Sequence, residues 1–355
     1  MKAYVLRGIN EFSLEDVEKP AITENEVLVR VKAAGICGSD IPRVYYTGTY
    51  SYPLIPGHEF SGVVEQVGNK VDEKWCGKRV GIFPLIPCRS CGPCLKKQSE
   101  MCRKYSYLGS RRDGGFAEYV AVPADNLVEL PEGVSFEEAA MLEPMAVAVH
   151  AMRRIAPTAA DTVTVCGLGT IGLLLVMFLK EAGVKRILVV GNKDFQYQSV
   201  LRLGIPKEDY CDGRTNDVVQ WILDKTDNHG ADVFFECVGK NETVATAIDS
   251  TIPGGKIMLV GNPYSDMHLE KALYWKILRN QLLVTGTWNS SFAFPGDAVE
   301  EDDWRYVLRR LEQKRVTPAE FITHRFSLEE LEQGFHIMRD KAEDYVKVMG
   351  IVPEE

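Results

Sequence analysis

Four cysteines stand close together at a regular spacing: Cys88, Cys91, Cys94 and Cys102 fall within 15 residues, with two residues between the first three. Thiolates at such spacing serve as metal ligands, and four of them close a tetrahedral shell with no open position, which is typical of structural zinc. An iron–sulfur cluster is the alternative, because runs of this spacing also hold such clusters. We expect structural zinc rather than free thiols.

A second group of metal-ligand residue types is dispersed over three short motifs: Cys37-Gly38-Ser39-Asp40, Gly57-His58-Glu59 and Glu143-Pro144. A thiolate, an imidazole and a carboxylate suit a catalytic zinc, which keeps a fourth position for water or a substrate oxygen. Asp40 is placed to orient the ring of His58 from behind. Each residue alone also fits an ordinary buried thiol, core histidine or surface acid, and the spacing does not join the three motifs.

A glycine motif, Gly167-Leu168-Gly169-Thr170-Ile171-Gly172, follows an apolar run and opens an apolar helical pattern. In this context the motif predicts dinucleotide binding. Gly167 permits the tight turn, Gly169 lets the backbone approach a pyrophosphate, and Gly172 lets the helix pack closely on the sheet. The free N–H groups of the helix then bind the phosphates. A tight strand-to-helix turn without a ligand is the alternative.

The position that reads the cofactor ribose departs from the usual pattern. About 20 residues after the motif, where NAD-binding proteins carry an acidic residue, stand Gly191, Asn192 and Lys193. Without the carboxylate nothing repels a 2′-phosphate, and Lys193 can pair with one. We expect NAD(P)(H) with a preference for NADP(H); the alternative is that Lys193 is solvated and Asp194 contacts the ribose. The predicted cofactor contacts are Gly167, Gly169, Thr170, Ile171, Gly172, Asn192, Lys193, Cys237, Val260 and Gly261.

The elements that must position these residues change in type along the chain. Up to about residue 150, β-branched runs such as 26–32 and 60–67 alternate with Gly and Pro turns, which predicts a strand-rich unit. From Asp161 onward, short apolar strands alternate with segments long enough for helices, which predicts a doubly wound parallel sheet. We expect strands at 162–166, 187–190, 232–237 and 256–260 and helices at 171–182, 302–314 and from Ser327 to Arg339.

Length and composition limit the class of protein. The 355 residues are enough for two domains. Lys and Arg number 41 against 50 Asp and Glu, so no net cationic field attracts nucleic acid or an anionic membrane. Nine cysteines and the lack of an apolar leader fit a reducing compartment, and the longest apolar run is shorter than the about 20 residues of a membrane span. We expect a cytoplasmic protein.

Taken together, the motifs resemble the zinc-containing medium-chain alcohol and polyol dehydrogenases over essentially the whole chain. Besides the motifs above, the resemblance rests on Asp113–Tyr119 and Thr323–Phe326. A closer likeness, to members that act on polyol phosphates, lies in segments 37–43, 84–88, 109–116 and 276–279, with sorbitol dehydrogenases as the next neighbours. The chain departs from the family at Gly191, where an acidic residue is usual, and at Trp75-Cys76-Gly77, where a Pro-Gly-Asp-like turn is more usual.

The resemblance implies an α/β fold in which a GroES-like β-rich catalytic domain, residues 1–148 and 290–355, is interrupted by a Rossmann domain, residues 149–289, with the active cleft at their junction. It also implies a homodimer or homotetramer with two zinc ions per chain, one catalytic and one structural. The implied roles in the catalytic centre are zinc binding by Cys37, His58 and Glu143, exchangeable or water-linked binding by Glu59, and proton relay by Ser39.

The implied reaction moves a hydride between a nicotinamide and a secondary alcohol of a polyol or polyol phosphate, whose oxygen the zinc would activate. Arg43 stands at a position where sorbitol dehydrogenase-like sequences carry a substrate-facing tyrosine. A guanidinium at that position can bind a phosphate through paired hydrogen bonds. The alternative is that Arg111 and Arg112 pair with acidic residues and only Arg43 faces the substrate. The expected substrate contacts are Arg43, Tyr107, Arg111, Arg112 and Asn289.

Three other classes share parts of the pattern. A zinc-free quinone reductase would need the glycine motif but not the two sets of zinc ligands. A zinc-ribbon nucleic-acid module could use the segment from Cys88 to Cys102, but the chain is acidic. An NAD(P)-sensing protein would keep the dinucleotide unit without turnover. The complete ligand sets favour the dehydrogenase.

Overall fold

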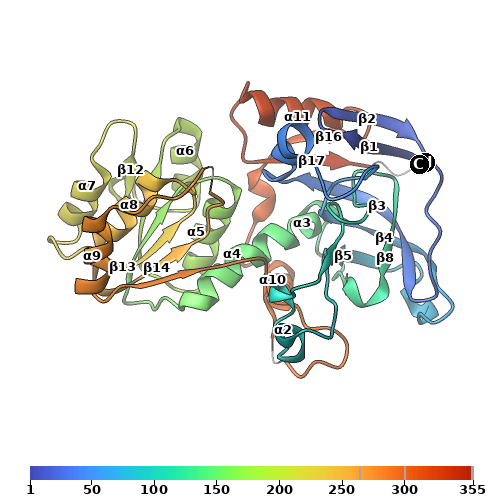
Figure 1. The fold of residues 1–355 in the computed structure, drawn as a ribbon, viewed down its shortest axis with the longest axis horizontal. Coiled ribbons are helices and arrows are strands. Elements are labelled where there is room, and N and C mark those ends of the chain that lie inside the picture. The colour runs from blue at the N-terminus through green and yellow to red at the C-terminus, as the bar shows by residue number, and fades with distance from the viewer. Residues whose placement is uncertain (264, 300, 353–355) are drawn as a thin grey trace. The chain divides into compact units, whose positions relative to one another are not determined.

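A computed structural model describes residues 1–263, 265–299 and 301–352 of the chain. Two compact units divide it (Figure 1): the first is formed by Met1–Ala146 with Ser290–Glu355, and the second by Val147–Asn289. Among the described residues, no helix has both the length and the apolar character that crossing a membrane requires.

The second unit contains a six-stranded sheet whose strands all run parallel, in the order β12-β11-β10-β13-β14-β15. The strands are β10 (Thr162–Cys166), β11 (Arg186–Gly191), β12 (Tyr210–Asp212), β13 (Ala231–Glu236), β14 (Thr251–Leu259) and β15 (Leu283–Gly286). The connecting helices are α5 (Thr170–Glu181), α6 (Asp194–Arg202), α7 (Val218–Lys225), α8 (Asn241–Ser250) and α9 (Lys271–Arg279). This order confirms the predicted doubly wound sheet, and β12 and β15 extend it beyond the four expected strands.

Burial on both faces explains why successive residues of the central strands are buried together. Val163 and Val165 of β10 and Phe234 and Phe235 of β13 are fully buried, as expected for a parallel sheet covered on both sides. Helix α5 is likewise buried from Gly172 to Leu179. A helix that is apolar all round must lie in the interior, so the helix that follows the glycine motif is fixed firmly to the sheet.

The first unit is built mainly from antiparallel strands. The strands are β1 (Lys2–Gly8), β2 (Glu11–Asp16), β3 (Glu26–Ile36), β4 (Glu59–Val67), β5 (Arg79–Ile82), β6 (Leu85–Ile86), β7 (Ser106–Tyr107), β8 (Tyr119–Pro123), β9 (Leu127–Glu129), β16 (Ile322–Ser327) and β17 (Lys347–Ile351). The helices are α1 (Asp40–Pro42), α2 (Gly92–Leu95), α3 (Phe136–Ala140), α10 (Asp303–Glu312) and α11 (Leu331–Asp340), together with α4 (Leu142–Ile155), which continues into the second unit.

Strand β3 organises the main sheet of this unit. The sheet has the order β16-β17-β3-β4-β5-β9, and β8 also pairs with β3. Strand β17, from the C-terminal part of the chain, therefore lies directly against β3, with Met349 opposite Gly35. On the other side of β3, Gly35 lies opposite Glu59 of β4. Three segments that are distant in the sequence thus meet at one glycine.

One expected helix start is wrong. The helix expected from Ser327 begins at Leu331, and Ser327 is the last residue of β16. The Ser327 hydroxyl does donate to Glu330, at 3.2 Å, but this contact closes the turn between the strand and the helix. Pairing of β16 with β17 extends to Ser327 opposite Ile351 and outweighs the local helix signal.

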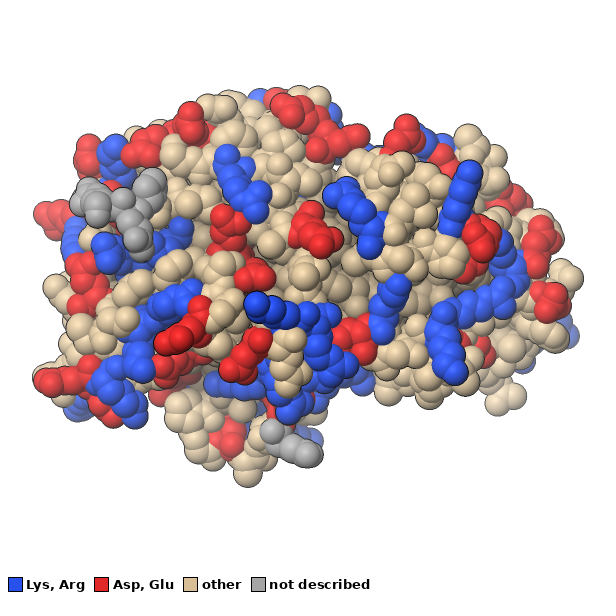
Figure 2. Space-filling model, turned by 180° about the vertical axis from the view of Figure 1, so that it is seen from behind, with Lys and Arg blue, Asp and Glu red and all other residues tan. Residues whose placement is uncertain are grey.

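Charged side chains of both signs share the surface. Figure 2 shows Lys and Arg side chains interspersed with Asp and Glu side chains over the face that it draws. Many of these groups form exposed ion pairs, such as Lys70 with Glu24 at 2.6 Å and Arg89 with Asp125 at 2.7 Å. Such pairs contribute little to stability.

Candidate functional site

Strands β3 and β4 bring the first two dispersed motifs together. Cys37 directly follows β3, and His58 directly precedes β4. Because these strands are antiparallel neighbours, the two residues meet at the same end of the sheet. The ligand atoms of Cys37, His58 and Glu59 all lie within 4.8 Å of one another, a group we call the β3–β4 cluster. His58 and Glu59 are buried.

Asp40 contacts two residues of this cluster, Cys37 and His58. Its carboxylate is fully buried, accepts a hydrogen bond from the backbone N–H of Cys37 at 3.0 Å, and lies 3.5 Å from Nδ1 of His58. Arg43 forms an ion pair with the same carboxylate. Burial raises the pKa of Asp40, but the charges of His58 and Arg43 outweigh that effect and hold the pKa below its usual value. Asp40 is therefore anionic and fixes both Cys37 and His58.

Glu143 lies beside the cluster rather than within the 4.8 Å group. It is buried, and the hydroxyl of Tyr107 donates to its Oε1 at 3.2 Å. Burial raises the pKa of Glu143 to about 7, with a further contribution from the charge of Glu59. Zinc binding by Glu143 stays a prediction. The hydroxyl of Ser39 donates to Sγ of Cys37 at 3.2 Å, so Ser39 does lie at the cluster.

The chemistry of this donor set fits a divalent cation. A thiol, an imidazole and a carboxylate converge in a buried place, and a second carboxyl group lies nearby. Burying several such groups without a positive charge is costly. Burial lowers the pKa of His58, but the negative charges of Asp40 and Cys37 raise it well above its usual value. The β3–β4 cluster is therefore a buried group of metal-ligand residue types with anionic side chains around His58.

One positive group in this centre was missed by sequence reasoning. Lys347, the first residue of β17, is buried and forms an ion pair with Glu59. Its ammonium also donates to the carbonyl of Ile36 at 3.0 Å. The signal in the sequence was a single lysine at the start of an otherwise apolar strand, but nothing local indicated its partner.

The four cysteines of the other motif also come together in the first unit. Their sulfur atoms all lie within 4.8 Å of one another, with 3.4 Å between Cys91 and Cys94 and 3.9 Å between Cys91 and Cys102. Zinc–sulfur bonds of about 2.3 Å place tetrahedral ligands about 3.8 Å apart, whereas a disulfide needs about 2.05 Å. The arrangement therefore fits a four-thiolate zinc site.

The glycine motif has the backbone geometry that the dinucleotide interpretation requires. Gly167 has φ of +98°, a conformation that favours glycine. A Cβ on Gly172 would lie 1.9 Å from the carbonyl oxygen of Gly167, whereas a Cβ on Gly169 would meet nothing within 4 Å. Gly169 caps the start of α5, so the open space lies at the N-terminal end of this helix, the end that favours a phosphate.

A second loop lies beside the glycine motif. Cys237, directly after β13, donates its backbone N–H to the carbonyl of Cys166 at 2.8 Å. The buried carboxylate of Glu236 accepts from the N–H groups of Val238 and Gly239 at 2.8 and 2.9 Å. The backbone N–H groups of Val260 and Gly261 donate to the Glu236 carbonyl. Glu236, another residue missed by sequence reasoning, thus fixes the loop where the strand order reverses, the usual place for a dinucleotide.

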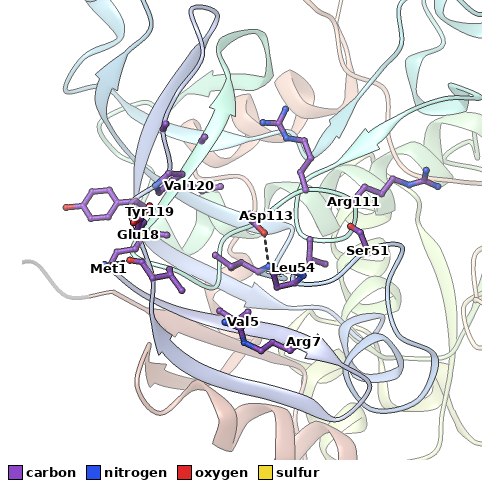
Figure 3. A pocket seen from close by; sticks show the side chains of 17 residues that line it. Met1, Val5, Arg7, Glu18, Ser51, Leu54, Arg111, Asp113, Tyr119 and Val120 are labelled. Carbon is purple, nitrogen blue, oxygen red and sulfur yellow. Dashed lines mark hydrogen bonds between the residues drawn. The ribbon is translucent and has the colours of Figure 1, made fainter.

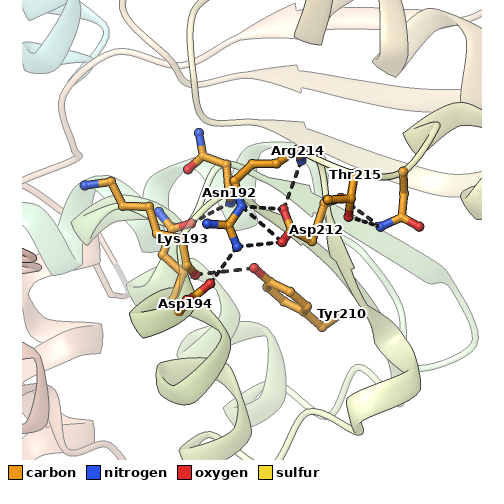
Figure 4. Close-up of polar contacts among 9 residues, drawn as sticks. Asn192, Lys193, Asp194, Tyr210, Asp212, Arg214 and Thr215 are labelled. Carbon is orange, nitrogen blue, oxygen red and sulfur yellow. Dashed lines mark hydrogen bonds and ion pairs between the residues drawn. The ribbon is translucent and has the colours of Figure 1, made fainter.

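The end of β11 explains the missing acidic residue. A Cβ on Gly191 would lie 2.9 Å from Oε1 of Gln196 and 3.0 Å from the Tyr210 hydroxyl, so a larger residue there would require both side chains to shift. Nearby, Arg214 pairs with Asp212 and with Asp194, each at 2.6 Å (Figure 4).

The predicted ribose-end residues lie at the same edge of the sheet. Asn192 donates its backbone N–H to Gln196, and Lys193 caps the start of α6 with its ammonium over the ring of Phe195. Arg214 was not predicted, although the turn Asp212-Gly213-Arg214 follows a strand at this edge.

Among the expected substrate residues, the three arginines have different partners. Arg43 pairs with Asp40, Arg112 pairs with Glu26, and Arg111 stacks on the rings of Tyr50 and Tyr105. Tyr107 packs edge-on against the His58 ring, with centroids 5.8 Å apart. Asn289 is buried and is the last residue of the second unit.

A cavity of about 510 Å³ opens beside Arg111 and Arg112 in the first unit (Figure 3). Residues from β1 and β8 line it together with the segment 51–55, and Asp113 accepts the N–H of Ile55 on its wall at 2.9 Å. The residues of the β3–β4 cluster do not line it. The cavity is therefore separate from the metal-ligand residues.

Comparisons with known proteins show the family to which the chain is related. Residues 23–132 match the alcohol dehydrogenase GroES-like domain, and residues 170–313 match the zinc-binding dehydrogenase family. Galactitol 1-phosphate 5-dehydrogenase of Escherichia coli K12 is 34% identical over 312 residues, 88% of each chain. L-threonine 3-dehydrogenase of Bacillus subtilis is 32% identical over 338 residues, 92% of this chain and 91% of its own. A zinc-binding dehydrogenase of Sinorhizobium meliloti, solved bound to NADP, is 28% identical with a TM-score of 0.89, covering 99% of this chain and 98% of its own.

Replacing Cys94 with serine tests the four-cysteine site. We expect Cys94→Ser to release about one zinc per chain and to lower the melting temperature by about 4 °C or more, because a three-thiolate shell binds zinc less tightly. Metal analysis and calorimetry measure both effects. Cys76→Ser is the matched control, since Cys76 is exposed and lies outside the cluster. Equal zinc content in the two variants contradicts the assignment.

Two alanine substitutions in the glycine motif should behave differently. Gly172→Ala should destabilise the fold by about 1–3 kcal/mol because its methyl group meets the Gly167 carbonyl. Gly169→Ala should leave the melting temperature unchanged, since nothing lies near its Cβ, but weaken dinucleotide binding by about tenfold or more because the methyl group faces the pyrophosphate. Calorimetry and cofactor titration measure the two effects. Equal cofactor affinity of Gly169→Ala and the wild type would count against the site.

Proposed function

Because the chain belongs to the zinc-binding dehydrogenase family, we propose that it transfers a hydride between a nicotinamide dinucleotide and a secondary alcohol of a polyol or polyol phosphate. The observation that carries the proposal is the buried convergence of Cys37, His58 and Glu59 in a chain that also has a dinucleotide-type glycine turn. A zinc-free dinucleotide-dependent reductase would not require the metal-ligand cluster. A zinc-binding module without redox activity would not require the glycine turn.

The residues of the cluster have distinct parts in this chemistry. Cys37, His58 and Glu59 would hold a zinc ion, which would supply a lowered pKa for an alcohol oxygen; a bound nicotinamide would supply the hydride chemistry. Asp40 holds the His58 ring and the Cys37 backbone in place, so the ligands are oriented before metal binds. The Ser39 hydroxyl lies 3.2 Å from Cys37 Sγ, and we assign it the transfer of the alcohol proton.

For the substrate we propose a hexitol phosphate, with galactitol 1-phosphate as the first compound to test. The support is the 34% identity to an enzyme named for that substrate and the presence of Arg43 at the cluster. Its side chain is 17% exposed, and its Nη1 donates to Asp40. A guanidinium has four further N–H donors, which suit the paired oxygens of a phosphate.

An activity screen tests the reaction and the substrate together. Zinc-loaded protein should oxidise a hexitol phosphate, and His58→Ala should abolish that activity. Arg43→Lys keeps a cation beside Asp40 but loses the planar donor pair. It should therefore lower kcat/KM for the hexitol phosphate by about tenfold or more, while changing kcat/KM for the free hexitol by less than about threefold. Steady-state kinetics on both substrates measure the difference.

The other outcomes of the screen are equally informative. Wild-type preference for the free hexitol, or equal losses on both substrates in Arg43→Lys, would place the chain with dehydrogenases of unphosphorylated polyols. Absence of alcohol oxidation with a full zinc content would contradict the proposed reaction.

For the cofactor we propose a preference for NADP(H). Gly191 has no carboxylate that would repel a 2′-phosphate, and Lys193 and Arg214 supply positive charge at the same end of the sheet. The solved relative bound to NADP gives further support. Asp194 and Asp212 both pair with Arg214 in the structure. Without Arg214, their carboxylates would repel a phosphate and would accept hydrogen bonds from the ribose hydroxyls.

Removing Arg214 should therefore shift the cofactor preference toward NAD. We expect Arg214→Ala and Lys193→Ala each to lower kcat/KM for NADP by about tenfold relative to that for NAD. Kinetics with both cofactors measure the ratio. Arg202→Ala, which removes an exposed charge from the last turn of α6, is the matched control. A wild type that prefers NAD, with no response to either substitution, would contradict the preference.

We also propose that the chain forms a homodimer through β15. This strand lies at the edge of the parallel sheet and is exposed along most of its length; Leu283 is 54% exposed. Helix α9 has no buried residue, and Trp275 is 51% exposed. An open apolar edge favours pairing with another strand. Two copies of β15 related by a two-fold axis satisfy both edges at once.

A charge at this edge should dissociate the dimer. Leu283→Asp should shift the mass in solution from dimer to monomer, because pairing would place like charges close together. Analytical ultracentrifugation measures the mass. Ile9→Asp, at an exposed apolar position in the other unit, is the control and should leave the mass unchanged. A monomeric wild type contradicts the proposal.

A further inference from the structure

A buried ammonium group lies at the candidate metal centre. Lys347 and Glu59 form an ion pair in which each side chain is only 2% exposed. Lysine is almost never buried this completely unless it is paired. A lysine that served only to fill space in a strand would be replaceable by an apolar residue at lower desolvation cost. The position of Lys347 therefore needs a further explanation.

The pair lies across β3 and joins the two ligand-bearing strands. Lys347 reaches from β17 over Gly35 to Glu59 on β4, and its ammonium also donates to the carbonyl of Ile36, directly before Cys37. A Cβ on Gly35 would lie 2.5 Å from Glu59 Oε2 and 2.6 Å from Lys347 Cε. The ion pair therefore requires glycine at position 35 of β3.

We propose that Lys347 is the positioning residue of the metal centre: it holds the Glu59 carboxylate in the metal-free protein and competes with the metal ion for that carboxylate. The inference rests on the proposed metal site. It assigns to Lys347 two effects of opposite sign, stabilisation of the metal-free fold and weakening of metal binding.

The two effects follow from one set of charges. Without metal, Lys347 offsets the negative charge that Glu59 adds to a buried place beside Glu143. With metal, the same carboxylate faces a dication within the β3–β4 cluster, and the ion pair with the ammonium then withholds this carboxylate from the metal. Replacing Lys347 with an apolar side chain of similar length should lower the stability of the metal-free protein and raise its affinity for zinc.

Thermodynamic linkage makes the inference quantitative. The stability lost in the metal-free protein, less the stability lost in the zinc-loaded protein, must equal the gain in zinc-binding free energy. A side chain that is merely structural lowers both stabilities equally and leaves zinc affinity unchanged. Stability and affinity are measured independently, so the equality can be tested without any assay of activity.

The experiment compares four proteins at one pH: wild type, Lys347→Met, Glu59→Gln and the double variant. Zinc affinity is measured by chelator competition, with His58→Ala identifying the zinc that remains in the four-cysteine site. We expect Lys347→Met to bind the centre's zinc about tenfold more tightly and to melt at a lower temperature when metal-free. With cobalt in place of zinc, its visible spectrum should change because Glu59 becomes a fuller ligand.

The double variant and a conservative variant supply the controls. In the Glu59→Gln background no carboxylate is left to compete for, so Lys347→Met should no longer tighten zinc binding. Lys347→Arg keeps the positive charge and should restore the wild-type affinity. A Lys347→Met chain that folds only when zinc is supplied also supports the inference. If that chain does not fold at all, the double variant and Lys347→Arg still carry the test.

The result that overturns the inference differs from the one that overturns the metal site. Unchanged zinc affinity in Lys347→Met, or an equal gain in the presence and absence of Glu59, removes the competing role of Lys347. If His58→Ala loses no zinc relative to the wild type, the metal site itself is wrong, and with it the proposed reaction.

Discussion

The buried ion pair between Lys347 and Glu59 is the interaction on which the candidate active site depends. It joins β17, β3 and β4 at Gly35, and both Cys37 and His58 sit at the ends of the strands that it crosses. Beside this pair, Arg43 and His58 both face the buried carboxylate of Asp40. The metal-ligand residues are thus held by a continuous set of buried charges, which explains why the unit places so many ionisable groups where burial alone would exclude them.

The candidate dinucleotide site of the second unit depends instead on close approach of the backbone to the ligand. Gly167 turns the chain, Gly172 admits the Gly167 carbonyl, and Gly191 leaves room for Tyr210 and Gln196. Glu236 then ties the neighbouring loop to its own strand through backbone N–H groups. Small residues and backbone hydrogen bonds, rather than opposing side-chain charges, shape this site.

The sequence predicted most where the signal was local. The family resemblance and the α/β class with a doubly wound sheet are confirmed, and β10 begins and ends where expected, because an apolar run is followed directly by glycine. Strand β12 has only three residues, too few for a pattern. The four-cysteine cluster was visible from spacing, whereas Lys347 was not, because its partner Glu59 is 288 positions away. The cytoplasmic location and the expected absence of nucleic-acid and membrane partners stay predictions.

The interrupted first unit has a consequence for biosynthesis. Ile36 and Lys347, which meet beside Cys37, are separated by 311 positions. At about 5–20 residues per second, the ribosome needs roughly 15 to 60 s to make the lysine after the strand that waits for it. Throughout that interval residues 33–36 of β3 lack their partner strand β17, whereas the intervening 143-residue unit, Val147–Asn289, is complete and free to fold once Asn289 is made, before β17 is translated. The nascent chain therefore assembles its inserted unit first, and chaperone protection is needed most by the half that was translated earliest.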